Sequence, residues 1–400
     1  MYIKKNYLEF WHLTSLLGLV LLTKLTVDMY LPILLSIKQA LATNDIVLKL
    51  SLSLYMVGFA FSLIISAPLA DRFGVKKIMV LSTISYLITA LICAFAQNMT
   101  TIIIARFVQS MSGGSGTVLG RLEANRTYDK INQIKALSYF STITSMASVI
   151  LPFITTYLIE WFNWRAAFIG MAMIAVISLK LITKYIEDDS RQIVLQISMF
   201  KLGKIYKHLL TNKIFLTLSF VTMCTWCNYF IYLSATPFIY QEYLGLSSFY
   251  FALQLAITSL GYGLGTIIVR RLVDQYELEK MIWWSNALTL LLASILGLLV
   301  IIFPISSAIL ISMFSLIMFF VGIILPCCQS LILNIFTKHT SNTLALYFFL
   351  QFLSAGISSM IINFFSYDAL VYLMVILTFL FSIAKLVLYH LVMWLPHTKQ

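Results

Sequence analysis

The chain has 400 residues, of which 60% are hydrophobic and only 10% are charged. Soluble domains carry charge at roughly a quarter of their positions, so this composition excludes an ordinary soluble enzyme, a DNA-binding protein and a secreted disulfide scaffold. The net charge of +12 does not by itself indicate a nucleic-acid partner, because the location of the basic residues decides what they bind. We predict a membrane protein whose surroundings are the lipid bilayer, with no nucleic acid bound.

Apolar windows recur along the whole chain. A hydrocarbon core of roughly 30 Å takes about 20 helical residues to cross. The sequence therefore predicts an all-α membrane protein with twelve transmembrane helices, at 11–37, 46–70, 78–96, 99–121, 134–160, 166–186, 213–239, 248–271, 281–303, 306–335, 342–366 and 369–394. With these spans, most of the 27 Lys and Arg residues fall in loops on one side. By the positive-inside rule, this asymmetry predicts an even number of spans and two cytoplasmic termini.

Two ionisable residues lie within the first predicted span. Asp28 lies ten residues before Lys38 at the outer end of the span, so it is about 15 Å deep at 1.5 Å per residue. Lys24 precedes Asp28 by four positions, which puts both side chains on one helix face. An ionisable group in mid-membrane costs roughly 2.5–3.5 kcal/mol on insertion scales, so each is expected to have a partner or a function.

The role of Lys24 has two interpretations. Lys24 can neutralise Asp28 and hold it as a carboxylate. Alternatively, Lys24 faces a cavity and binds an anionic group of a substrate. Both interpretations favour a zwitterionic or carboxylate ligand over a simple lipophilic cation.

The segment between the second and third spans reads Ala-Pro-Leu-Ala-Asp-Arg-Phe-Gly-Val-Lys-Lys, residues 67–77. Its glycine permits a tight turn, and its aspartate can cap a helix terminus and pair with a basic partner such as Arg121 or Arg126. Such a latch would hold the cytoplasmic face closed. We therefore predict a cytoplasmic gate formed by Asp71, Arg72, Gly74, Lys76, Arg121 and Arg126.

The fourth predicted span contains Arg106, seven residues after Met99 at the outer start and so about 10 Å deep. Arg106 could meet Asp28 within the amino-terminal half, either as a switchable pair or as a static salt bridge. The glycine clusters at 113–116 and 261–265 are not phosphate loops, because neither follows a strand or carries a Walker lysine. They are expected to allow close helix approach or sliding.

A polar stretch at 187–212 separates six predicted spans from six. Its apolar residues recur at helical spacing, which predicts an amphipathic helix on the inner membrane surface. Two halves with equal numbers of spans are typical of a duplicated transporter. The predicted domains are an amino-terminal bundle at 1–186, a cytoplasmic linker at 187–212 and a carboxy-terminal bundle at 213–400.

The carboxy-terminal spans contain aromatic and amide side chains that suit a small organic ligand near the midplane. The candidates for lining a substrate cavity, together with Lys24, are Trp226, Asn228, Tyr232, Gln254 and Gln351. Each one could instead serve packing or an interhelical hydrogen bond. Lys385 is expected to extend to the inner interface. We expect no metal site, since all five cysteines fall in apolar helices.

Residues 67–77 resemble the G-x-L-A-D-R-x-G-R-K signature of the major facilitator superfamily, with Ala67 and Val75 departing from it. Further segments resemble the Bcr/CflA (bicyclomycin and chloramphenicol resistance) branch of drug:proton antiporters. These segments look like T-D-M-Y-L-P at 26–32, A-R-F-x-Q-G at 105–110, G-W-R-x-x-F at 163–168 and Y-x-S-A-S-P-F at 232–238. Thr155 and Thr156 stand where this branch usually carries glycines.

The resemblance implies two six-helix bundles around a central cavity and a secondary active transporter rather than an enzyme. In the family, the carboxylate that matches Asp28 takes up the proton, and the arginine that matches Arg106 tunes it. We therefore expect proton-coupled export of a drug or metabolite by a monomer in a bacterial inner membrane. The proton gradient would supply the driving force, without a cofactor.

Two alternatives remain open. The chain could move a specific anionic metabolite, such as a carboxylate siderophore, in either direction, as Lys24 suggests. It could also be a sensor or scaffold that keeps the transporter fold without transporting. A membrane-embedded enzyme is disfavoured, because no nucleophile–base pair or metal-ligand set stands out in the sequence.

Overall fold

The computed structural model describes residues 2–187, 199–273, 275–336, 340–361, 365 and 367–393. This part of the chain is built from α-helices and one short π-helix, and the predicted all-α fold is confirmed. The chain divides into two compact units, Met1–Ser198 and Met199–Gln400. Each unit is described by itself.

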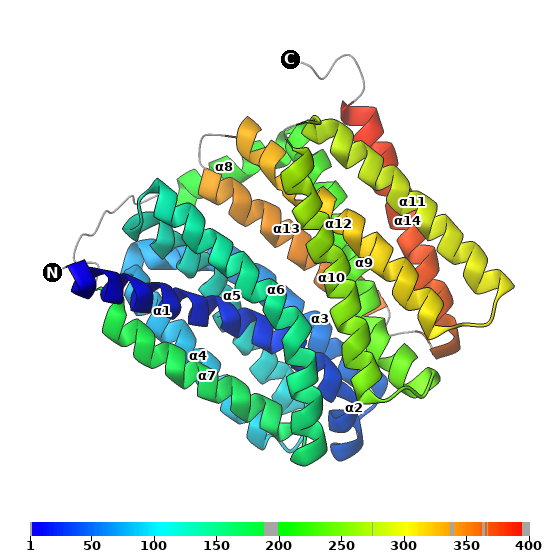
Figure 1. Cartoon of the computed structure of the whole chain (residues 1–400), viewed down its shortest axis with the longest axis horizontal. Coiled ribbons are helices and arrows are strands. Elements are labelled where there is room, and N and C mark those ends of the chain that lie inside the picture. The colour runs from blue at the N-terminus through cyan, green and yellow to red at the C-terminus, as the bar shows by residue number, and fades with distance from the viewer. Residues whose placement is uncertain are drawn as a thin grey trace. The chain divides into compact units, whose positions relative to one another are not determined.

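The amino-terminal unit contains seven helices within its described residues (Figure 1). They are α1 (Tyr2–Asp28), α2 (Tyr30–Ala40), α3 (Asp45–Phe73), α4 (Val75–Phe95), α5 (Met99–Thr127), α6 (Lys130–Trp161) and α7 (Arg165–Tyr185). Helix α5 packs against α1, α3 and α4, while α7 packs against α1 and α4. This arrangement surrounds α5 with other helices of the unit.

The carboxy-terminal unit follows the same helical plan. Its elements are α8 (Met199–Thr211), α9 (Lys213–Pro237), the π-helix η1 (Phe238–Tyr243), α10 (Ser248–Leu272), α11 (Leu278–Ile302), α12 (Ser307–Ile335), α13 (Thr340–Ile361) and α14 (Tyr367–Met393). Helix α9 packs against α13 and α14, α10 packs against α12, and α11 packs against both α12 and α14.

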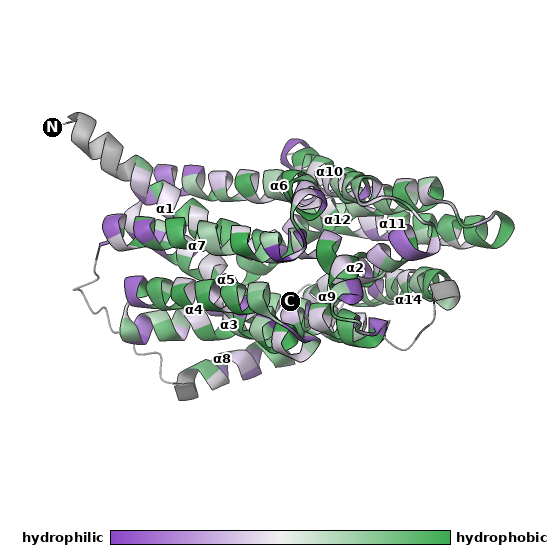
Figure 2. Cartoon of the chain, turned by 90° about the horizontal axis from the view of Figure 1, so that it is seen from below, coloured by the Kyte–Doolittle hydropathy of each residue, from purple (hydrophilic) through white to green (hydrophobic). Residues whose placement is uncertain are grey.

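Eleven helical segments of the described chain are long and apolar enough to cross a membrane, and hydrophobic residues cover most of the length of the long helices (Figure 2). Helix α5, which corresponds to the fourth predicted span, has the length but is too polar to count among them. Arg106, Gln109 and Ser110 of α5 are fully buried. Since these polar groups are enclosed by other helices, α5 need not be apolar to lie at membrane depth.

The first predicted span, at 11–37, is not one uninterrupted α-helix. Its regular hydrogen bonding is interrupted at Met29, between α1 and α2, although Met29 keeps helical angles (φ −84°, ψ −19°) and still donates to the carbonyl of Leu25 at 3.1 Å. The cause is Pro32, which has no N–H to donate to the carbonyl of Asp28 four residues earlier and whose ring crowds that carbonyl. The break therefore occurs directly beside the acidic residue of this span.

The predicted linker at 187–212 contains helix α8, which packs against α9 and α13. Figure 2 shows both polar and hydrophobic residues on α8. The part of the predicted linker at 188–198 lies outside the described residues.

Candidate functional site

Asp28 is the last residue of α1 and only 8% of its surface is exposed. Because Pro32 leaves the carbonyl of Asp28 without its helical partner, the polar main chain and the carboxylate lie together at the break. Discontinuous helices with freed main-chain groups are a recurring way to build an ion site at membrane depth.

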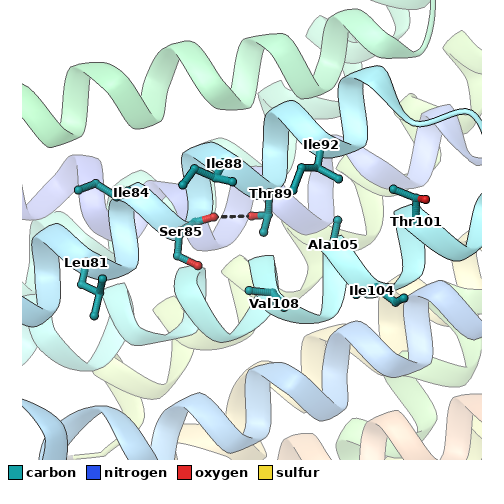
Figure 3. A pocket seen from close by; sticks show the side chains of 10 residues that line it. All are labelled: Leu81, Ile84, Ser85, Ile88, Thr89, Ile92, Thr101, Ile104, Ala105 and Val108. Carbon is teal, nitrogen blue, oxygen red and sulfur yellow. Dashed lines mark hydrogen bonds between the residues drawn. The ribbon is translucent and has the colours of Figure 1, made fainter.

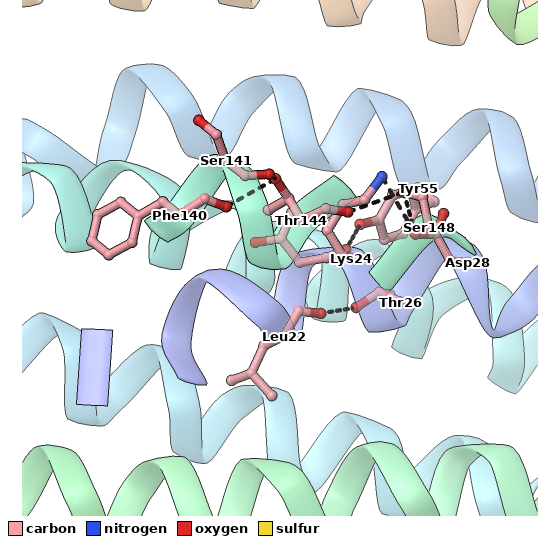
Figure 4. A network of polar contacts seen from close by, with 10 residues as sticks. Leu22, Lys24, Thr26, Asp28, Tyr55, Phe140, Ser141, Thr144 and Ser148 are labelled. Carbon is pink, nitrogen blue, oxygen red and sulfur yellow. Dashed lines mark hydrogen bonds and ion pairs between the residues drawn. The ribbon is translucent and has the colours of Figure 1, made fainter. Parts of the chain in front are cut away.

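Two side chains contact the Asp28 carboxylate (Figure 4). The Lys24 ammonium lies 3.4 Å from Oδ2, and the Ser148 hydroxyl of α6 donates a hydrogen bond of 2.9 Å to the same oxygen. The side chain of Lys24 is 30% exposed and that of Asp28 is 11% exposed. The pair is therefore partly withdrawn from solvent, with the lysine on its more accessible side.

Arg106 of α5 is fully buried and does not form the expected ion pair with Asp28. Its Nη2 donates a hydrogen bond of 3.0 Å to the carbonyl of Thr26, two residues before the acid. Its guanidinium carbon lies 3.4 Å from the ring centre of Tyr30 and 5.0 Å from that of Tyr55. The arginine thus holds the main chain beside Asp28, and aromatic faces stabilise its charge, while Lys24 takes the carboxylate.

The remaining donors of Arg106 are its most unusual feature. Nε and Nη1 are buried, and neither has a hydrogen-bond partner within the described residues. A buried guanidinium with two unused donors is costly unless something else binds them. This site can therefore accept a further hydrogen-bond acceptor from a ligand or from a rearranged carboxylate.

Hydroxyl groups fix α1 against its neighbours around this site. The Thr26 hydroxyl lies 2.7 Å from the hydroxyl of Tyr86 on α4, and Thr23 donates a bond of 2.6 Å to the carbonyl of Gly113 on α5. Gly116, one turn further along α5, meets α1 so closely that an added Cβ would crowd the carbonyl of Leu19. These contacts hold Lys24 and Asp28 in a defined register.

Sequence reasoning missed Ser148, Tyr30 and Tyr55 as members of this site. Tyr30 lies within the segment that resembles T-D-M-Y-L-P, which was a usable signal. Ser148 and Tyr55 carry no charge and lie in spans that contain many hydroxyl groups, so only the folded structure distinguishes them.

The residues expected at a cytoplasmic gate lie where α3, α4 and α5 end or begin. Gly74 is the single residue between α3 and α4, with φ of 95°, a left-handed conformation that glycine adopts without strain. Arg126 lies 3.3 Å from the Asp71 carboxylate and joins α5 to α3. Both side chains are more than a third exposed, so this ion pair alone is a weak latch.

The other predicted gate residues surround this pair. Arg72 stacks on Phe73, with 5.1 Å from its guanidinium carbon to the ring centre. Lys76 lies in the first turn of α4, and Arg121 lies on the same helix as Arg126.

A cluster that the sequence did not reveal lies at the same end of α5. His12 of α1 lies 3.5 Å from the Glu123 carboxylate through Nε2 and 2.8 Å from the Tyr128 hydroxyl through Nδ1. Together with the Asp71–Arg126 pair, it ties three helices together at one end of the amino-terminal unit.

The five candidate cavity residues of the carboxy-terminal unit do not form one group. Tyr232 accepts a hydrogen bond from Gln254 and stacks on Phe314 at 4.0 Å, so this pair has a packing role between α9, α10 and α12. Trp226 lies against Phe230 and, at 4.7 Å, against Phe352. All three amide side chains are buried, with polar atoms that have no partner within the described residues: Asn228, Gln254 and Gln351.

Lys385 does not extend to an interface, contrary to expectation. It is fully buried on α14, close to Cys224 and Cys328, and its Nζ has no hydrogen-bond partner in the described part of the chain.

Comparison with known proteins explains this architecture. The family model described as Major Facilitator Superfamily matches residues 16–359 and 218–399. The chain belongs to the major facilitator superfamily. Its likeness to solved structures of this superfamily shows the fold: the D-xylose-proton symporter superposes with a TM-score of 0.74 at 14% identity, covering 97% of this chain and 98% of that one. The partially occluded inward open form of the xylose transporter XylE from E. coli gives 0.71, covering 99% of both chains.

Two curated relatives in the major facilitator superfamily are more similar in sequence. The chain is 28% identical over 267 residues to the uncharacterized MFS-type transporter YdgK of Bacillus subtilis (strain 168), covering 65% of each protein. It is 24% identical over 242 residues to the multidrug resistance protein MdtL of Salmonella typhimurium (strain LT2), covering 60% of this chain and 61% of that protein. The alignments thus span less than two thirds of either relative.

Proposed function

We propose that this major facilitator superfamily protein is a proton-coupled exporter of small organic solutes, of the Bcr/CflA kind, in a bacterial inner membrane. The observation that carries the proposal is the Asp28 carboxylate: it lies where α1 ends, its side chain is 11% exposed, and it contacts one cation and one hydroxyl. The similarity to a relative named as a multidrug resistance protein supports drug efflux.

Protonation of Asp28 is the proposed coupling step. With Asp28 ionised, the Lys24–Asp28 pair carries no net charge; with Asp28 protonated, the pair carries +1. When the ion pair is lost, the Lys24 side chain is no longer held at the carboxyl end of α1. The hydrogen bond from Arg106 to the Thr26 carbonyl keeps the main chain of α1 in place. The membrane potential acts on this change with about 2.3 kcal/mol per charge per 100 mV.

The test is gradient-driven transport in proteoliposomes with an imposed pH gradient. The probes are ethidium as a cation, chloramphenicol as a neutral drug and citrate as a carboxylate. Asp28→Asn should abolish gradient-driven movement while leaving thermal unfolding unchanged. Asp45→Asn is the matched control, because Asp45 is also ion-paired, at 2.6 Å from Lys38, but lies at the start of α3.

Gradient-driven transport that persists in Asp28→Asn would exclude the coupling role. If the unaltered protein moves none of the probes under any gradient, the non-transporting sensor or scaffold is favoured instead.

A second candidate function, transport of an anionic metabolite such as a carboxylate siderophore, is supported by two observations. Lys24 is partly exposed beside Asp28, and Arg106 has two unpartnered donors nearby. In the same proteoliposomes, Lys24→Ala should then reduce citrate movement and leave ethidium movement intact. Unchanged transport of every anionic probe would exclude this candidate.

A further inference from the structure

A groove runs along the outside of the amino-terminal unit between α4 and α5, with a volume of about 480 Å³. Figure 3 shows Leu81, Ile84, Ile88 and Ile92 in a row along α4, with Ile104 and Val108 of α5 on the other wall. The row extends over twelve residues, or roughly 16 Å of helix. The groove is therefore long enough for a single extended acyl chain to lie along it.

The walls of the groove offer an occupant few hydrogen bonds. Thr89 donates to the carbonyls of Ser85 and Tyr86, and the Ser112 hydroxyl donates to that of Ser85 at 2.9 Å. These hydroxyl groups thus form hydrogen bonds within the protein, and the surface of the groove consists mainly of apolar side-chain atoms. Seven of the ten residues that line the groove are β-branched isoleucine, valine or threonine, whose restricted rotamers keep the groove preformed.

The groove lies at membrane depth, because α4 is one of the helices apolar enough to span a bilayer. Leu81 and Ile88 are 63% and 51% exposed, so the groove is open to the surrounding hydrocarbon. Lipid acyl chains are the occupant that this location supplies in excess.

A positive charge at one end of the groove favours lipids with an anionic headgroup. Lys77 lies one helical turn before Leu81 and shares the face of α4 that lines the groove. Its side chain is exposed, and no ion pair of Lys77 is found within the described residues. Asp71, six residues earlier in the chain, is paired with Arg126. This end therefore presents an unneutralised ammonium at the point where a headgroup would meet the chain-binding groove.

We propose that the α4–α5 groove is a binding site for an anionic phospholipid, with one acyl chain between the isoleucines and the headgroup phosphate at Lys77. The positive-inside rule assigns this end of α4 to the cytoplasmic leaflet. The proposal is independent of the coupling role of Asp28, since none of the groove residues belongs to that site.

The test is photo-cross-linking of the full-length protein in phosphatidylcholine nanodiscs. Three probes carry a diazirine in the acyl chain: phosphatidylglycerol, phosphatidylcholine and palmitic acid. Cross-linked peptides are mapped by mass spectrometry. The phosphatidylglycerol probe is expected to label 81–92 and 104–108 more strongly than the phosphatidylcholine probe does.

Matched variants separate the contribution of the lipid headgroup to binding from that of the acyl chain. Lys77→Gln should reduce phosphatidylglycerol labelling of the groove about five-fold, the contribution expected of one lysine near an anionic headgroup. Lys180→Gln, at a lysine of α7 that is also exposed, should leave it unchanged. Ile88→Trp fills the groove and should reduce labelling, whereas Ile177→Trp places the same bulk at an exposed position of α7.

Equal labelling by phosphatidylglycerol and phosphatidylcholine, or labelling that Lys77→Gln leaves unchanged, would overturn the proposal. Labelling by palmitic acid alone would also overturn it, because the site would then bind fatty acids and not phospholipid. Lys77 is a surface residue, so the decisive variant is expected to fold.

Discussion

The setting of the Lys24–Asp28 pair depends on Pro32, four residues after the acid. Pro32 ends α1 at the acid, and the freed main chain is steadied by Arg106 through the Thr26 carbonyl. Lys24 of α1 and Ser148 of α6 both contact the same carboxylate oxygen of Asp28. A proton arriving at Asp28 would therefore disturb contacts between two helices, and not only a local charge.

Replacing Ser148 tests this link. A hydrogen bond to a charged group contributes roughly 1.5–3 kcal/mol, so Ser148→Ala should slow gradient-driven transport about ten-fold or more. The measurement is the initial rate of probe movement in proteoliposomes. Ser141→Ala is the control, because Ser141 is an exposed serine of α6 that donates to the Leu137 carbonyl. Equal rates for both variants would show that the bond from Ser148 has no role in transport.

Lys385 is a residue whose replacement is expected to stabilise the protein. It is fully buried, and its Nζ has no hydrogen-bond partner within the described residues. Burying an unsatisfied polar group costs about 1–3 kcal/mol. Lys385→Met, which keeps the length and removes the charge, should therefore raise the free energy of unfolding by a similar amount.

Thermal unfolding in detergent measures this gain, with exposed Lys180→Met as the control. A destabilised Lys385→Met variant would contradict the prediction, since it would mean that Nζ makes a favourable contact.

For single residues, the sequence identified the charged side chains within the spans but not all of their partners. Asp28, Lys24 and Arg106 stand out because ionised groups are rare in spans. Helical spacing correctly placed Lys24 beside Asp28. The contact of Arg106 with a main-chain carbonyl depends on the position of the helix break and on the faces of Tyr30 and Tyr55, which spacing along the sequence does not encode.

Among the elements, α10 and α12 approach each other closely at three glycines. A Cβ added at Gly261 or Gly265 would collide with the main-chain carbonyls of Ser315 and Phe319, and one added at Gly322 would collide with that of Tyr262. The contact is between main chains, so no side chain can move to relieve it.

Gly265→Ala should therefore cost about 1–3 kcal/mol of stability by overpacking. Gly263, two residues earlier on α10, is the matched control, because a Cβ there would meet nothing within 4 Å. Gly263→Ala should be neutral or stabilising by about 0.5–1 kcal/mol, since alanine is the better helix former. Thermal unfolding of both variants checks this, and equal stability would mean that the two helices separate easily.

The elements were predicted well where apolar periodicity is unbroken, as in α4, α10 and α12. The break between α1 and α2 was missed, although Pro32 was visible, because apolar residues continue on both sides of it. Helix α5 shows the reverse case: its polarity argues against a span on composition alone, and packing against α1, α3 and α4 accounts for that polarity.

On the scale of the whole molecule, membership of the major facilitator superfamily rests on both halves of the chain, which the family model matches. The distribution of basic residues predicts an orientation in the membrane with cytoplasmic termini, which can be measured directly.

The described cysteines are all buried, which gives a low background for labelling from solution. Gln97→Cys, between α4 and α5, should react with a membrane-impermeant maleimide added to intact cells. Glu187→Cys, just after α7, should react only after permeabilisation. Both positions are exposed. The opposite pattern would place the termini outside the cell.

The glycine contact between α10 and α12 has a mechanical consequence. Two helices whose main chains are in contact at successive turns cannot slide along each other without first separating. We therefore expect α10 and α12 to move together as one rigid body. Any alternation of access in the carboxy-terminal half is then expected to involve other segments, such as the junction of α9 with the π-helix η1.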